Sequence, residues 1–199
     1  MPTRLTPRFD AAVALARDLH DGQVRKGTET PYLSHLLAVA SIVLEAGGSE
    51  DEAIAALLHD GPEDAGGRAT LATIHERFGD AVAGIVDACT DTYEEPKPDW
   101  SARKQAYLAH LEDPATPDGA LLVSLADKLH NARAIAFDLR VHGDALWERF
   151  RTGSGPSQLW YYRSLADVFL RRRPGPLAEE LDRTVGEIER LAAEAARSG

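Results

Sequence analysis

Leu57-Leu58-His59-Asp60-Gly61-Pro62-Glu63-Asp64 joins an apolar helix end to an acidic turn. The apolar run over residues 53–58 predicts a buried helix. Gly61-Pro62 predicts its end, because proline cannot continue a helix and disfavours helical geometry in the residue before it. One imidazole and three carboxylates then lie beside helix-terminal carbonyls, which favour a cation. Since unpartnered buried charge is costly, the cluster indicates a metal ion; a solvated acidic turn is the alternative interpretation.

Helical periodicity continues on both sides of this stretch. Ser49 and Glu52 form a capping box that begins the helix leading to His59. The other expected helices cover residues 9–20, 32–46, 70–78, 80–90, 100–112, 120–137, 157–171 and 177–195. The expected breaks are Gly47-Gly48, the loop 91–99, the turn 113–119 and the segment Gly153 to Pro156. With no convincing strand, repeat or linker, we expect one all-α domain over residues 1–199, closed by a packing helix over 177–195.

Composition limits the classes of function. The chain has 199 residues and a net charge of −10, which argues against binding to a nucleic-acid polymer but not against a small phosphorylated ligand. Cys89 is the only cysteine, so a disulfide within the chain and a cysteine-based zinc site are excluded, and a reducing cytoplasm is expected. No secretory signal or membrane-spanning apolar run is present, so no membrane partner is expected.

Two further residues carry chemistry that the packing pattern does not require. His35 lies on the apolar side of helix 32–46, where a hydrogen-bonded core histidine is the alternative interpretation. Asp127 lies within an apolar helix, where aspartate is unfavourable without a partner; a salt bridge is the alternative. Together with His59 and Asp60 they supply two imidazoles and two carboxylates, a suitable set for a six-coordinate divalent metal that keeps positions open for water or substrate.

Four motifs extend this pattern. They are His20-Asp21-Gly22-Gln23-Val24-Arg25-Lys26-Gly27, Pro31-Tyr32-Leu33-Ser34-His35, the stretch quoted first, and Leu125-Ala126-Asp127-Lys128-Leu129-His130-Asn131. In this order they resemble the HD phosphohydrolase superfamily, and in particular the hydrolase domain of RelA/SpoT homologues, which remove the 3′-pyrophosphate from the alarmones ppGpp and pppGpp. Tyr162-Arg163-Ser164-Leu165-Ala166 is a weaker match. The resemblance covers residues 8–170. The chain is therefore similar to a stand-alone small alarmone hydrolase without a synthetase region.

The resemblance implies a single HD-domain bundle of about 9–11 helices around a central metal site. It implies Mn²⁺ held by His35, His59, Asp60 and Asp127, with Glu63 and Asp64 as general acid-base groups. It also implies a nucleotide site at Arg25, Lys26, Asn131 and Tyr162, with Lys97, Arg103 and Lys104 as candidates for the pyrophosphate. Solvated surface charge is the alternative for these lysines and arginines, and core packing is the alternative for Tyr162.

Three departures from the family pattern affect these expectations. Gly61-Pro62 replaces two apolar residues and stiffens the turn before Glu63. Leu36 stands where the family has proline after His35, without evident cost to a helix. Pro156-Ser157-Gln158 stands where the family has basic residues, which leaves the choice of substrate open.

Three functions therefore remain. The first is a Mn²⁺-dependent alarmone 3′-pyrophosphohydrolase. The second acts on a different substrate, either an adenine alarmone, (p)ppApp, or the 2′-phosphate of NADPH. The third is a nucleotide-sensing protein without turnover, which the acid-base pair Glu63-Asp64 argues against. The oligomeric state does not follow from the sequence.

Overall fold

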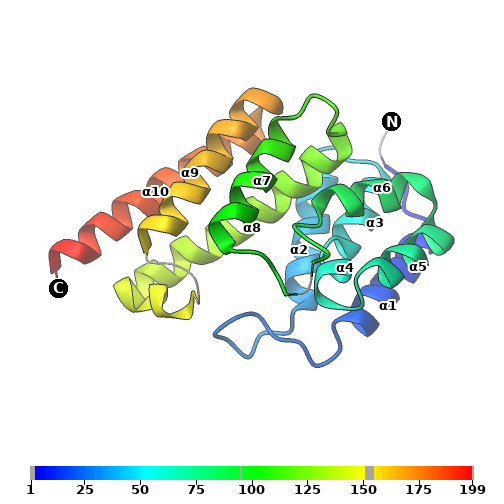
Figure 1. The fold of residues 1–199 in the computed structure, drawn as a ribbon, viewed down its shortest axis with the longest axis horizontal. Coiled ribbons are helices and arrows are strands. Elements are labelled where there is room, and N and C mark those ends of the chain that lie inside the picture. Colours follow the sequence, from blue (N-terminus) through cyan, green and yellow to red (C-terminus); the bar gives the residue numbers. More distant parts are fainter. Residues whose placement is uncertain (1–2, 95, 151–154, 199) are drawn as a thin grey trace. The chain divides into compact units, whose positions relative to one another are not determined.

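A computed structural model describes residues 3–94, 96–150 and 155–198 of the chain. Within these residues every regular element is helical, and the nearest approach to a strand is one isolated bridge between Val24 and Pro31. The elements are α1 (Pro7–Leu19), α2 (Leu33–Glu45), α3 (Glu50–Leu58), α4 (Gly61–Asp64), α5 (Arg68–Phe78), α6 (Asp80–Cys89), α7 (Trp100–Glu112), α8 (Asp118–His142), the 3-10 helix η1 (Gly143–Arg149), α9 (Gly155–Arg172) and α10 (Pro176–Ser198) (Figure 1). The predicted all-α fold and number of helices are confirmed.

The chain divides into two compact units, residues 1–126 and 127–199, with the division inside α8. The prediction of a single domain over residues 1–199 stays a prediction. In the part of the chain that the structure describes, no helix is both long and apolar enough to cross a bilayer.

The first unit is built around α3. Its residues 53–58 are completely buried, because α1, α2 and α6 all pack against this helix. The predicted capping box is present: Ser49 accepts a hydrogen bond from the backbone N–H of Glu52, whose carboxylate in turn accepts from the backbone N–H of Ser49. Gly48 allows the tight turn before it, since an added Cβ would lie 2.6 Å from Cγ1 of Val43. This turn and the cap set the direction in which α3 delivers His59.

The second unit contains the end of α8, η1, α9 and α10. Helix α10 lies along α9 (Figure 1) and buries one stripe of its surface: Ala178, Leu181, Val185, Ile188 and Ala192. The predicted packing helix is therefore found. Arg163 of α9 reinforces this pair through ion pairs with Asp182 at 2.5 Å and Glu189 at 2.8 Å.

Three local details differ from the expectations. Gly61-Pro62 ends α3 as predicted, but the acidic turn after it is a helical turn of its own, α4, because proline is favourable in a first turn. Part of the expected break at Gly153 to Pro156 lies outside the described residues, while Gly155 and Pro156 open α9. Helix α8 is longer than expected at both ends, and η1 carries no helical periodicity by which it could be predicted.

Candidate active site

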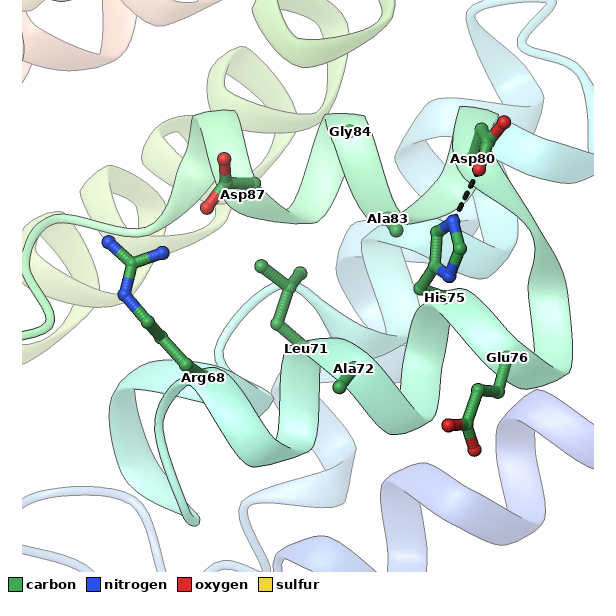
Figure 2. A pocket seen from close by; sticks show the side chains of 9 residues that line it. All are labelled: Arg68, Leu71, Ala72, His75, Glu76, Asp80, Ala83, Gly84 and Asp87. Carbon is green, nitrogen blue, oxygen red and sulfur yellow. Dashed lines mark hydrogen bonds and ion pairs between the residues drawn. The ribbon is translucent and has the colours of Figure 1, made fainter.

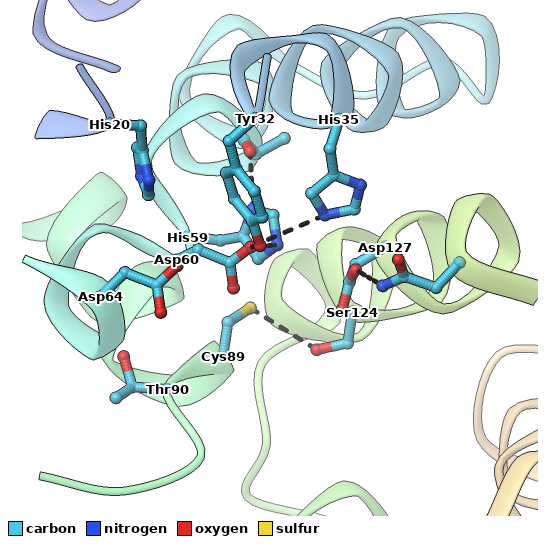
Figure 3. Close-up of polar contacts among 12 residues, drawn as sticks. His20, Tyr32, His35, His59, Asp60, Asp64, Cys89, Thr90, Ser124 and Asp127 are labelled. Atoms are coloured by element: carbon cyan, nitrogen blue, oxygen red, sulfur yellow. Dashed lines mark hydrogen bonds and ion pairs between the residues drawn. The ribbon is translucent and has the colours of Figure 1, made fainter. Parts of the chain in front are cut away.

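His35 and His59 meet through the packing of α2 on α3. His35 lies in the first turn of α2 and is fully buried, while His59 directly follows α3 and is 3 % exposed. The centroids of the two rings are 5.5 Å apart at an angle of 62°. Figure 3 shows both rings facing the side chain of Asp60.

Backbone hydrogen bonding fixes the tautomer of His59. Its Nδ1 lies 2.8 Å from the carbonyl oxygen of Ala56. A carbonyl oxygen only accepts, so Nδ1 carries the hydrogen and the neutral ring presents the lone pair of Nε2 on its other side. This is how metal-binding histidines are usually oriented, since their second ring nitrogen donates to a carbonyl or carboxylate.

Asp60 approaches both imidazoles. Its Oδ2 lies 3.1 Å from Nε2 of His59 and 3.6 Å from Nε2 of His35, and it accepts a 2.7 Å hydrogen bond from the hydroxyl of Tyr32. A carboxylate oxygen and an imidazole lone pair at 3.1 Å repel each other unless a cation or a proton lies near both. This donor set, with mixed nitrogen and oxygen atoms, therefore fits a divalent metal ion.

Asp127 supplies a further oxygen. It directly follows Ala126 in α8 and is 5 % exposed. One ligand atom from each of His35, His59 and Asp127 lies within 4.8 Å of the others. Asp127 also accepts hydrogen bonds from Lys128 at 2.7 Å and from Asn131 at 2.5 Å. The contact with Lys128 is the salt bridge considered from the sequence, and it is present together with the approach of Asp127 to the two histidines. Asn131 is thus one turn from Asp127 and bonded to it, on the predicted helix face.

Glu63 and Asp64 lie on α4, directly after Asp60. Lys97 donates to Oε1 of Glu63 at 2.9 Å, and the side-chain amide of Gln23 donates to Oδ2 of Asp64 at 2.8 Å. Gly61, where this sequence departs from the family, is buried against α1, since an added Cβ would lie 3.1 Å from Cδ1 of Leu19. A small residue here therefore allows α4 to pack closely.

Four of the predicted substrate residues lie in the loop after α1 or on α7. Arg25 lies over the ring of Tyr32, 5.9 Å from its centroid, and Lys26 is exposed in the same loop. Arg103 and Lys104 are part-buried and both contact the carboxylate of Asp91, Lys104 at 3.0 Å. These two cations are therefore engaged by the protein and differ from solvated surface charges.

Tyr162, the last predicted substrate residue, is 8 % exposed in the second unit, with its ring 5.9 Å from that of Tyr161. These contacts are those of a packed residue, and its role toward a nucleotide stays a prediction.

Three polar residues of this region had no assigned role in the sequence interpretation: His20, Gln23 and Tyr32. Each stands within one of the motifs quoted above. His20 and Gln23 are three residues apart, the spacing of a turn, and this spacing is the feature of the sequence that indicates their contact. A separate pocket lies between α5 and α6 and is lined by Arg68, Leu71, Ala72, His75, Glu76, Asp80, Ala83, Gly84 and Asp87 (Figure 2). No predicted site residue lines it.

Comparison with known proteins places this arrangement in a family. The family model described as HD domain matches residues 12–150. Over 132 residues the chain is 42% identical to the guanosine-3′,5′-bis(diphosphate) 3′-pyrophosphohydrolase MESH1 of Xenopus tropicalis, covering 62% of this chain and 70% of that protein. The chain belongs to the HD-domain hydrolases related to RelA and SpoT.

Other members of the HD-domain family support the same grouping. The bifunctional (p)ppGpp synthase/hydrolase SpoT of Escherichia coli is 31% identical over 140 residues, which are 68% of this chain but only 19% of SpoT. A solved structure, described as a metazoan ortholog of SpoT that hydrolyzes ppGpp and plays a role in starvation responses, matches with a TM-score of 0.73 and 28% identity. That match covers 93% of this chain and 97% of the other.

Proposed function

We propose that this HD-domain protein is a Mn²⁺-dependent hydrolase that removes the 3′-pyrophosphate from ppGpp and pppGpp, giving GDP or GTP and pyrophosphate. The observation that carries the proposal is the meeting of His35, His59 and Asp127 within 4.8 Å, next to Asp60. It is supported by relatives whose names state this activity. A small-molecule nucleotide is the proposed partner. A reducing cytoplasm fits the single cysteine, Cys89.

His35, His59, Asp60 and Asp127 would hold the metal ion. Imidazole and carboxylate together suit Mn²⁺, and the choice of Mn²⁺ rests on the family resemblance. When bound, a divalent cation supplies Lewis acidity that polarises a phosphoryl oxygen and activates water. The hydrogen bonds from Tyr32 to Asp60 and from His59 to Ala56 would keep these side chains oriented toward the ion.

Glu63 and Asp64 would move the protons. One carboxylate takes a proton from the attacking water, and the other, in its protonated form, gives one to the ribose 3′-oxygen as the P–O3′ bond breaks. Attack at the phosphorus next to the ribose leaves the 5′-diphosphate intact and releases pyrophosphate. A sensing protein without turnover has no use for such a pair beside the metal, so Glu63-Asp64 argues for an enzyme.

Recognition of the nucleotide is proposed for Arg25, Lys26, Asn131 and Tyr162. The planar guanidinium of Arg25 already lies over the Tyr32 ring, a geometry in which it can also stack on a base. Arg103 and Lys104 would face the pyrophosphate, whereas Lys97, which donates to Glu63, would orient that carboxylate. Because Arg103 and Lys104 share Asp91, they would approach the pyrophosphate as one preorganised pair of cations.

A substrate panel tests the proposal. The protein is incubated with Mn²⁺ and ppGpp, pppGpp, an adenine alarmone or NADPH, and the products are followed by chromatography and phosphorus NMR. We expect GDP and intact pyrophosphate from ppGpp in equal amounts. Release of one phosphate, with a 3′-monophosphate left on the nucleotide, would mean attack at the outer phosphorus. Hydrolysis of NADPH to NADH and phosphate, or of the adenine alarmone alone, would assign the protein to the second substrate class. Absence of turnover on every member of the panel would favour the sensor.

A further inference from the structure

His20 stands at the end of α1 and is 4 % exposed, yet neither the metal cluster nor the acid-base pair includes it. Its Nδ1 lies 2.7 Å from Oε1 of Gln23, and Nε2 of Gln23 donates to Asp64 at 2.8 Å. The carboxylate of Asp64 accepts this bond, so the amide oxygen of Gln23 faces His20, and Nδ1 of His20 must be the donor. The three side chains form one directed series of hydrogen bonds that ends on Asp64.

The ring of His20 also stacks on Tyr32. The two centroids are 5.0 Å apart and the rings are nearly parallel, with an angle of 21°. The Tyr32 hydroxyl donates to Asp60, as described above. One histidine therefore contacts the supports of two different carboxylates, Asp64 through Gln23 and Asp60 through Tyr32. Figure 3 shows His20, Tyr32, Asp60 and Asp64 together.

The backbone holds both supports in place. The N–H of Gln23 donates to the carbonyl of His20 at 3.0 Å, which closes a turn, and the N–H of Tyr32 donates to the carbonyl of Gln23 at 2.9 Å. The loop between them is pinned by the Val24–Pro31 bridge. Gln23 and Tyr32 are therefore fixed relative to each other and to His20, which a positioning function requires.

Packing alone does not explain a histidine at this position. Among the described residues, the buried Nε2 of His20 has no hydrogen-bond partner. Burying an unsatisfied polar atom is costly, and phenylalanine of similar shape would avoid that cost. What phenylalanine cannot supply is the Nδ1–H that holds Gln23.

We propose that His20 is a positioning residue that orients Asp64 through Gln23 and Asp60 through Tyr32. The catalytic role of Asp64 in this proposal rests on the proposed function. The neutral amide of Gln23 transmits orientation and does not carry a proton, so His20 takes no part in the proton transfer itself. Its two contacts, one polar and one aromatic, can be removed separately.

Three variants separate the contacts. His20→Phe keeps the stacked ring and loses the donor to Gln23. Gln23→Met removes this hydrogen bond and also the one from Gln23 to Asp64, while keeping the stack. His20→Asn keeps a donor at the position of Nδ1 and loses the ring. The readouts are kcat and KM for ppGpp at saturating Mn²⁺, the Mn²⁺ dissociation constant, and thermal stability.

For His20→Phe and Gln23→Met we expect kcat to fall roughly 10–100-fold, with KM and Mn²⁺ affinity unchanged, as for residues that orient a reacting group. The double variant should be no slower than Gln23→Met alone, because both changes interrupt one series of bonds. His20→Asn should keep kcat near that of the unmodified protein and bind Mn²⁺ about tenfold more weakly. Full kcat in His20→Phe, additive losses in the double variant, or unchanged Mn²⁺ affinity in His20→Asn would overturn the proposal.

Nitrogen NMR of the unmodified protein gives a test without substrate. At a pH above the usual titration range of histidine, the His20 signal, assigned by its loss in His20→Phe, should be that of the Nδ1–H tautomer. An Nε2–H tautomer would overturn the proposal whatever the kinetic constants of the variants. If the unmodified protein cleaved no nucleotide, the proposed function would fail, while the tautomer and the Mn²⁺ affinities would still decide the role of His20.

Discussion

The ammonium of Lys97 lies 2.9 Å from Oε1 of Glu63. These residues are 34 positions apart, and the loop before α7 brings Lys97 to α4. From the sequence, Lys97 was a candidate to bind the pyrophosphate of a substrate. In the structure it contacts Glu63, a candidate acid-base group. The two roles make different predictions for the same variant.

Lys97→Met should lower kcat about tenfold with KM little changed, because Glu63 loses the contact that orients it. Lys97→Arg, which keeps a donor, is the matched control and should retain most of the activity. The free energy of unfolding should change by less than about 1 kcal/mol, since the pair is partly solvated. Steady-state kinetics decide: a raised KM with unchanged kcat would assign Lys97 to substrate binding instead.

Glu63→Gln keeps the size of the side chain and removes the proposed proton acceptor. We expect turnover to fall by roughly 10²–10⁴-fold, the usual range for general acid-base catalysis, while Mn²⁺ stays bound. Turnover and elemental analysis of the same preparation provide the measurement. Loss of the metal would make Glu63 a ligand, and full activity would leave the proton transfer to Asp64.

His59→Ala removes one of the two imidazoles of the proposed metal site. Mn²⁺ content and hydrolysis should both be abolished, a larger loss than the 10–100-fold typical of groups that only orient a ligand. His142→Ala, at an exposed histidine of α8, is the control and should keep both. Undiminished Mn²⁺ in purified His59→Ala would contradict the assignment of this cluster.

The sequence predicted what local patterns determine. The apolar run of α3, its capping box and the stop at Gly61-Pro62 are contiguous, so the position of His59 and Asp60 at the helix end followed directly. Pairings between distant polar residues did not follow. The contact of Gln23 with Asp64 spans 41 positions, and no periodicity indicates which of many polar side chains meet across loops.

The cations of α7 illustrate the same limit. Arg103 and Lys104 read as surface charges or substrate groups, because Asp91 belongs to a polar loop of irregular sequence. Only the fold shows that this carboxylate is 7 % exposed and shared by both cations. Because both cations contact Asp91, we expect this carboxylate to stabilise the fold and to hold the two proposed pyrophosphate-binding side chains in place.

Asp91→Asn should destabilise the protein by about 3 kcal/mol, because it leaves two part-buried cations without their common counter-charge. For a chain of this length that corresponds to a decrease in Tm of roughly 8 °C. Glu94→Gln, which removes an exposed carboxylate from the same loop, is the control and should leave Tm unchanged. Equal Tm values for the two variants would show that the Asp91 cluster contributes nothing to folding.

Tyr93 links the same loop to the pocket between α5 and α6. Its ring stacks on Arg68 at 4.3 Å, and its hydroxyl donates to Oδ1 of Asp87 at 2.7 Å. Arg68 and Asp87 are seen on facing helices in Figure 2. Burial, and next the hydrogen bond to Asp87, raise the pKa of Tyr93 to about 12.

Because its pKa is raised on folding, the neutral hydroxyl of Tyr93 stabilises the folded state fully below the ordinary tyrosine pKa of about 10. This contribution should be lost as the pH rises from about 10 to the folded pKa of about 12. Denaturant unfolding should therefore show a steeper loss of stability with pH in this window for the unmodified protein than for Tyr93→Phe. Ultraviolet titration should show one late-ionising tyrosine that is absent from the variant.

Asp87→Asn separates the two causes of this pKa. It removes the negative charge but leaves the ring buried, so Tyr93 should titrate between its ordinary pKa and that of the unmodified protein, because burial is the larger cause. A return to the ordinary value in Asp87→Asn would mean that the carboxylate dominates. If the difference between the curves of the unmodified protein and Tyr93→Phe had its midpoint at the ordinary tyrosine pKa, Tyr93 would not be held against Asp87 in solution.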